Sequence, residues 1–121
     1  MGRTAILLMT LLALSSGAAD KAMAETDERH MLIARYYVSQ GNYAGAINRF
    51  KIVVINFQSS DYVEEAFYGL TEGYLALGSA SGAREAAGAL ECKFPNGDWT
   101  AKAKALLNSA GLVPADNPSR C

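Results

Sequence analysis

The sequence is poor in the residues that metal sites and catalytic centres need. It holds two cysteines and one histidine in 121 residues. A structural zinc site needs four thiolate or imidazole ligands, so these three residues are too few to build one. Eleven basic and twelve acidic residues leave a net charge of −1. This balance argues against a nucleic-acid-binding protein, whose affinity depends on clustered Lys and Arg.

Helix-breaking residues and markers of disorder are also scarce. Three prolines are present, one in the body of the chain and two near its end. Hydrophobic residues make up 50% and charged residues 19%, a composition that argues against an intrinsically disordered chain. Because alanine is abundant and breakers are few, the composition favours helix.

Residues 1–24 have the layout of a secretory signal peptide. Arg3 precedes an apolar stretch over residues 5–14, and small residues follow it. The stretch has about half of the ~20 residues of a membrane-spanning helix, which disfavours an uncleaved anchor. We expect cleavage after Ala24, with Ala19 as the other candidate, and export to the periplasm. A wrongly assigned start or a short buried helix is the alternative interpretation. No cysteine lies near either cleavage site, so the sequence predicts export without a lipid anchor.

The rest of the chain repeats itself. A shift of 37 residues superimposes four equivalent pairs: Tyr37 on Tyr74, Gly41 on Gly78, Ala46 on Ala83, and Phe57 on Phe94. Periodic apolar residues and turn residues predict helices over 28–40, 43–57, 62–77, 81–93 and 99–110. We expect Asp27, Asn42, Asp61 and Asp98 to cap four of these helices.

This spacing resembles the tetratricopeptide repeat, a helix-turn-helix unit of about 34 residues. The sequence therefore predicts an all-α, tetratricopeptide-like α-solenoid over residues 25–110, with two helix pairs and a closing helix. Alanine at 46 and 83 would let the helices of each pair cross closely. Residues 111–121 are predicted to form a flexible tail.

A more specific resemblance covers roughly residues 29–107. The runs Ala34 to Tyr37 and Ala46 to Val54 are similar to the C-terminal half of the BamD family, and Glu72 to Gly78 continues the likeness. This family comprises repeat-containing lipoproteins of the machine that assembles outer-membrane β-barrels. The resemblance implies a scaffold at the inner face of the outer membrane. It would bind the POTRA domains of the barrel-forming subunit and accessory lipoproteins. Family members carry about five repeats and a lipid-bearing cysteine, so this chain departs from the pattern.

Five residues are candidates for binding a partner. Arg49 is the strongest, because it lies off the apolar stripe of its helix and the resemblance places it on the docking face. A solvated arginine, or one paired within the repeat, is the alternative. The other candidates are Asn48, Arg35, Tyr36 and Lys51.

No catalytic constellation emerges from the sequence, so we expect neither an enzyme nor a cofactor. His30 has no serine or cysteine partner nearby and is interpreted as a surface or helix-start residue. Cys92 and Cys121 could pair in an oxidising compartment, or remain as free or intermolecular thiols. A generic periplasmic adaptor and a truncated, non-functional paralogue are the alternative functions.

Overall fold

The structure, a computed structural model, describes residues 26–121 and contains five helices and no strand in that range. The signal-peptide prediction for residues 1–24 lies outside the described residues. The helices are α2 (Asp27–Ser39), α3 (Tyr43–Asn56), α4 (Val63–Ala76), α5 (Ala80–Lys93) and α6 (Asp98–Ser109). Each lies within about one residue of its predicted range. Among these residues, no helix is both long and apolar enough to cross a membrane.

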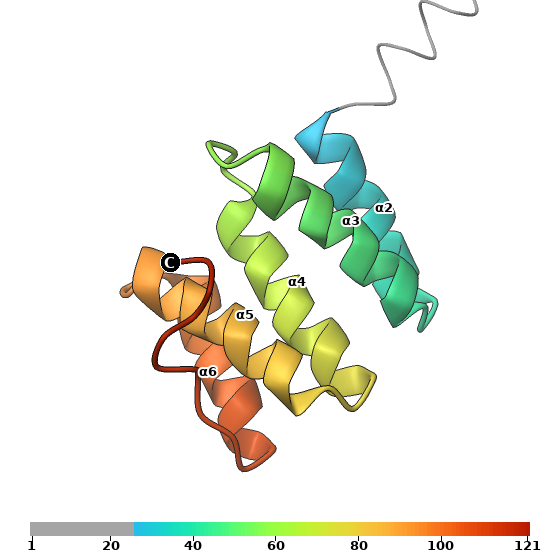
Figure 1. The fold of residues 1–121 in the computed structure, drawn as a ribbon. Helices are drawn as coiled ribbons and strands as arrows, with labels where there is room; N and C mark the ends of the chain where they lie inside the picture. The colour runs from blue at the N-terminus through green and yellow to red at the C-terminus, as the bar shows by residue number, and fades with distance from the viewer. Residues whose placement is uncertain (1–25) are drawn as a thin grey trace, which may run out of the picture.

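The five helices stack as two antiparallel pairs and a closing helix, which confirms the predicted all-α solenoid of tetratricopeptide type (Figure 1). The pairs are α2 with α3 and α4 with α5. Gly41 and Gly78, at φ of 71° and 78°, follow the first helix of each pair. Glycine adopts this left-handed conformation without the steric cost that a Cβ would add, so both pairs turn tightly.

The first residues of the helices differ in part from the predicted caps. Asn42 caps α3 as expected, because its side chain accepts a hydrogen bond from the Gly45 N–H at 3.0 Å. Thr26 rather than Asp27 caps α2, accepting from the Arg29 N–H at 3.1 Å. Asp27 is already helical, and its carboxylate instead accepts from the Ser60 hydroxyl at 2.6 Å.

The predicted capping roles of Asp61 and Asp98 were wrong. Tyr62 holds the N-cap position of α4 and makes no side-chain cap bond. Gly97 holds that position in α6 and has no side chain to offer. Glu64, the second residue of α4, supplies the missing acceptor and receives the backbone N–H of Trp99 at 2.9 Å. A carboxylate at this end of a helix also complements the helix dipole.

Helix α4 forms the centre of the stack, in contact with α3, α5 and α6. Two of its glycines face α3: the Phe50 ring packs on Gly69, and the Ile47 side chain packs on Gly73. Ala46 and Ala83, predicted at the crossings within the pairs, are fully buried. Small residues therefore set the approach of the helices both within and between the pairs.

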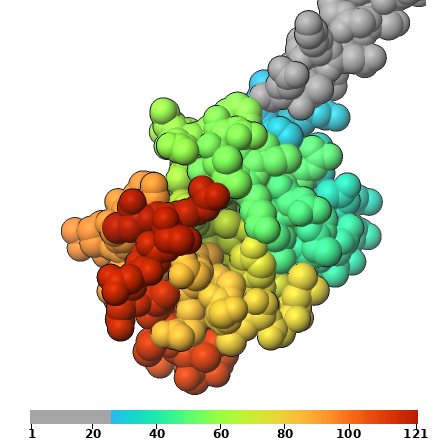
Figure 2. Space-filling model, viewed as in Figure 1, coloured from blue at the N-terminus to red at the C-terminus, as the bar shows by residue number. Residues whose placement is uncertain are grey.

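The tail of residues 111–121, predicted to be flexible, runs back along α5 (Figure 2). Arg84 donates its Nε–H to the Val113 carbonyl at 2.8 Å, and its own carbonyl accepts the Ala115 N–H at 2.9 Å. Ser119 donates both its N–H and its hydroxyl to Glu85 Oε2, at 3.0 and 3.2 Å. We call residues 111–121 the C-terminal strap.

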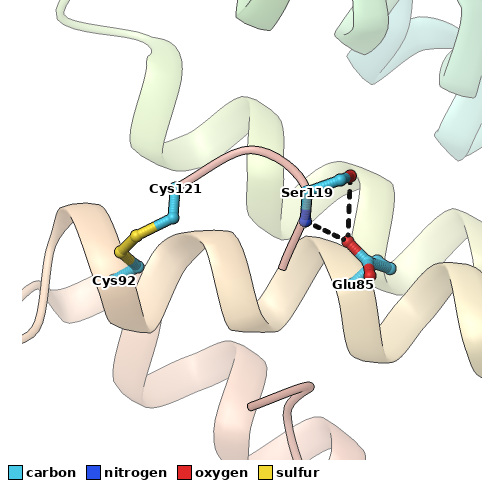
Figure 3. Close-up of a disulfide and its surroundings, with 4 residues drawn as sticks. All are labelled: Glu85, Cys92, Ser119 and Cys121. Carbon is cyan, nitrogen blue, oxygen red and sulfur yellow. Dashed lines mark hydrogen bonds between the residues drawn. A yellow bond between two sulfur atoms is a disulfide. The ribbon is translucent and has the colours of Figure 1, made fainter. Parts of the chain in front are cut away.

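A disulfide ends the strap. Cys121 bonds to Cys92 near the end of α5, with the two Cα atoms 5.6 Å apart (Figure 3). Of the alternatives that the sequence leaves open, the structure therefore contains the intramolecular bridge. The loop that it closes spans 29 residues and includes all of α6.

Substituting Gly69→Ala is expected to destabilise the fold. Alanine favours a helix interior over glycine by roughly 0.5–1 kcal/mol, so an unobstructed site would gain stability. Here a Cβ would collide with the Phe50 ring, and the net loss should be about 1–3 kcal/mol. Urea unfolding followed by circular dichroism measures the change. Asn48→Ala, at an exposed position in α3, serves as the control and should stay within about 0.5 kcal/mol. A gain in stability for Gly69→Ala would contradict this packing.

Replacing both cysteines by serine is expected to lower the free energy of unfolding by about 3 kcal/mol. The estimate follows from the loop-closure entropy that a crosslink of this span removes from the unfolded chain. Urea unfolding without reductant compares Cys92→Ser/Cys121→Ser with the oxidised protein. Dithiothreitol should lower the stability of the natural chain and leave the double variant unchanged. If the oxidised natural chain and the double variant are equally stable without reductant, the disulfide contributes nothing to the free energy of unfolding.

Candidate functional site

Arg49, the leading candidate for partner binding, is half-buried on α3 and faces α2. Its Nη1 atom lies 3.2 Å from Nδ1 of His30, which is buried in the first turn of α2. The His30 ring also lies 5.9 Å from the ring of Phe57, between centroids. The guanidinium is thus steadied from within the protein and keeps part of its surface exposed.

Arg35 takes part in an intramolecular ion pair. Its guanidinium donates to both carboxylate oxygens of Glu65 on α4, with the shortest N–O distance at 2.6 Å. It also lies over the Tyr62 ring, 5.6 Å from the centroid. Arg35 therefore fastens α2 to α4, and its charge is already compensated by a carboxylate.

The other three candidates are more exposed but do not share one surface. Asn48 and Lys51 lie one turn apart on α3, and the Lys51 ammonium is 5.8 Å from the centroid of the Tyr74 ring. Tyr36 lies on α2 and is 60% exposed, with Leu32 56% exposed one turn before it. The structure thus places Asn48, Arg49 and Lys51 on α3 but on different sides of it, because Arg49 faces α2 and Lys51 lies by Tyr74 of α4. Arg35 and Tyr36 lie on α2.

A groove runs between α3 and α5 above α4, and we call it the α3–α5 groove. Its volume is about 340 Å³. Lys51 and Ile55 line it from α3, and Ser119 and Arg120 of the strap line it from the side of α5. Its apolar lining includes Val54, Phe67, Leu70, Ala86 and Ala89. The groove combines an apolar floor with Lys51 and Arg120 at its sides and with Glu85 of α5, whose carboxylate already accepts two hydrogen bonds from Ser119. This lining suits a polypeptide ligand.

A second concavity lies among α2, α4 and α6, and we call it the α2–α4–α6 hollow. Its volume is about 220 Å³, and Tyr68, Glu72 and Trp99 contribute to its lining together with the Arg35–Glu65 pair. Burial raises the pKa of the Glu72 carboxyl above its ordinary value. Burial, and then the charge of Glu72, raise the pKa of the Tyr68 phenol. Within residues 26–121, no group of three potential metal-ligating side chains occurs in this hollow or elsewhere.

Several of these contacts could not be predicted from the sequence. The Glu64–Trp99 bond and the Arg35–Glu65 pair join residues at least 30 positions apart in the chain, and the hollow around Glu72 is lined from several helices. Helical periodicity describes one helix at a time and cannot reveal such pairs. A signal was available for Trp99, since a lone tryptophan beside a helix start is a natural place to look for a contact.

These features define a class: a helical repeat protein of the tetratricopeptide type, with two concave surfaces. Comparison with known sequences then identifies the family. The YfiO family, described as outer membrane lipoprotein, matches residues 18–90, and the chain belongs to it. No solved structure matches the chain.

Curated relatives agree with this assignment. The outer membrane protein assembly factor BamD of Caulobacter vibrioides is 37% identical over 90 residues, which cover 74% of this chain. BamD of Rickettsia prowazekii is 35% identical over 81 residues, or 67% of this chain. The matched parts make up 30% and 32% of these relatives, so the chain spans about a third of their length.

The pH dependence of stability should carry the signature of His30. Burial, and then the charges of Arg49 and Arg29, hold the pKa of this imidazole below its usual value of 6.5. The unfolded chain therefore takes up a proton more readily than the folded one as the pH falls through this value. The contribution of His30 to the free energy of unfolding is therefore fully present above about pH 6.5. It is lost as the pH falls through the pKa of His30 in the folded state.

We expect the natural chain to lose more stability between pH 7.5 and pH 5.5 than His30→Gln. Urea unfolding midpoints at both values measure the two losses. Glu72 contributes with the opposite sign, because its raised pKa favours the folded state as the pH falls. That contribution is common to both proteins and cancels in the comparison. If the two proteins lose equal stability between these pH values, His30 is not a source of the pH dependence.

Proposed function

We propose that this protein is a non-enzymatic scaffold in the assembly and insertion of β-barrel proteins into the outer membrane. The observation that carries the proposal is the match to the YfiO family over residues 18–90, together with curated relatives named outer membrane protein assembly factor. The protein would act from the periplasmic side of that membrane and without a cofactor, through contacts between folded protein surfaces.

The proposed partners are the POTRA domains of the barrel-forming subunit and accessory lipoproteins. The α3–α5 groove supports a role in protein binding, because stacked helix pairs present a preformed surface whose ordering costs little on association. Two basic groups, Lys51 on α3 and Arg120 on the strap, outnumber the one acidic group of the lining, Glu85, which is bound to Ser119, so the groove would favour an acidic segment of the partner. Arg49 lies on the other flank of α3, facing α2, and would make a separate contact with the partner.

Co-purification tests the proposed function directly. The tagged full-length chain is expressed in its own host, envelopes are solubilised in mild detergent, and captured proteins are identified by mass spectrometry. We expect the POTRA-bearing subunit to be enriched over an untagged control. A well-folded chain that captures periplasmic proteins but none of the barrel-assembly subunits would contradict the proposal and favour a more general adaptor.

Charge reversal at Arg49 is expected to weaken binding to purified POTRA domains by about tenfold or more, which corresponds to ~1.4 kcal/mol. The half-buried guanidinium is held in place by His30, so it would meet a partner carboxylate in a fixed geometry. Titration calorimetry compares Arg49→Glu with the natural chain, and circular dichroism checks that helix content is unchanged. Arg29→Glu, an exposed charge reversal on α2, is the matched control. Equal affinities for the natural chain and Arg49→Glu would remove Arg49 from the interface.

A further inference from the structure

The α2–α4–α6 hollow contains one acidic group whose charge is not compensated. Glu65 and Arg35, at its edge, neutralise each other through three hydrogen bonds. Glu72 has no hydrogen bond or ion pair with any residue in the range 26–121, although its carboxyl is partly withdrawn from water. The hollow as a whole therefore carries a net negative charge centred on Glu72.

Two aromatic rings lie beside this carboxylate. Tyr68 precedes Glu72 by one turn of α4, so the two side chains project from the same face of the helix. The rings of Tyr68 and Trp99 lie 5.1 Å apart between centroids, tilted by 43°. Aromatic faces attract cations, and the ammonium of Lys102 already lies 4.3 Å from the centroid of the Trp99 ring. Lys102 forms no ion pair with Glu72 within the described residues.

These groups select one kind of occupant. An acidic side chain would be repelled by Glu72, and a wholly apolar one would bury the carboxylate without a partner, which is costly. A basic side chain satisfies both parts of the lining, because its alkyl stem can lie along the rings while its charged end reaches the carboxylate.

We propose that the α2–α4–α6 hollow receives an arginine or lysine side chain of a partner polypeptide, with the stem against Tyr68 and Trp99 and the cation on Glu72. This inference rests on the proposed function as a protein-binding scaffold. It adds a second contact surface, on a different set of helices from the α3–α5 groove, and it states the chemistry that this surface recognises.

Trp99 provides the reporter for a direct test, since it is the chain's single tryptophan. The ¹⁵N-labelled, oxidised full-length chain is titrated with the peptide acetyl-Leu-Arg-Leu-amide, and the indole N–H signal is followed by NMR. The comparison peptide carries citrulline, which has nearly the shape of arginine but no charge. We expect a saturable shift of the indole signal with the arginine peptide and at least about fivefold weaker binding of the citrulline peptide.

Two variants assign the selectivity to the carboxylate. Glu72→Gln keeps the size of the side chain and removes its charge, so it should bind the two peptides equally. Glu28→Gln removes an exposed acid from the first turn of α2 and should keep the full preference for arginine. Equal binding of the two peptides by the natural chain, or an unchanged preference in Glu72→Gln, would overturn the inference.

The test separates this inference from the proposed function. If the natural chain shows no preference for the arginine peptide but still captures the barrel-assembly subunit, only the proposed binding of a basic side chain in the hollow is contradicted. If the natural chain prefers the arginine peptide but captures none of those subunits, the binding of a basic side chain in the hollow is supported and only the proposed function is contradicted.

Discussion

The close approach of α3 to α4 is the contact on which the rest of the structure depends. It is possible because two glycines one turn apart on α4, Gly69 and Gly73, leave space for the Phe50 and Ile47 side chains of α3. This contact joins the first helix pair to the second, so it turns two separate hairpins into one continuous core. Both concave surfaces follow from it, because the α3–α5 groove and the α2–α4–α6 hollow are the spaces left on either side of α4.

The sequence allowed the helices, their order and the turns between them to be predicted, because each of these depends on residues close together in the chain. Apolar periodicity and the glycines at 41 and 78 determined the two pairs. The alanines at the crossings could be recognised because the repeat places them at equivalent positions. The glycines on α4 carry no such signal, since a glycine inside a helix is equally compatible with a weak helix and with a packing contact. Only the facing side chains of α3 show which it is.

The candidate site could be predicted less well than the fold, for a physical reason. The position of Arg49 off the apolar stripe of its helix favoured a partner-binding role, but a polar group off that stripe can still be bound by a neighbouring helix. Arg35 is held by Glu65 and Arg49 contacts His30, whereas Asn48 and Lys51 remain available on α3. The strap was unforeseen because its contacts with α5 depend on the path of the chain after α6, which periodicity does not describe.

The hydrogen bond from the backbone N–H of Trp99 to Glu64 affects how readily the last helix, α6, opens. In a stack of repeats the terminal helix usually frays first, because it has a neighbour on one side only. Here the carboxylate of an inner helix holds the first turn of α6, and Gly97 leaves the space in which that carboxylate lies. Opening of α6 must therefore break a contact with the centre of the molecule. Slow amide hydrogen exchange should extend from α4 into the beginning of α6, and the second pair and the closing helix should open as one cooperative unit.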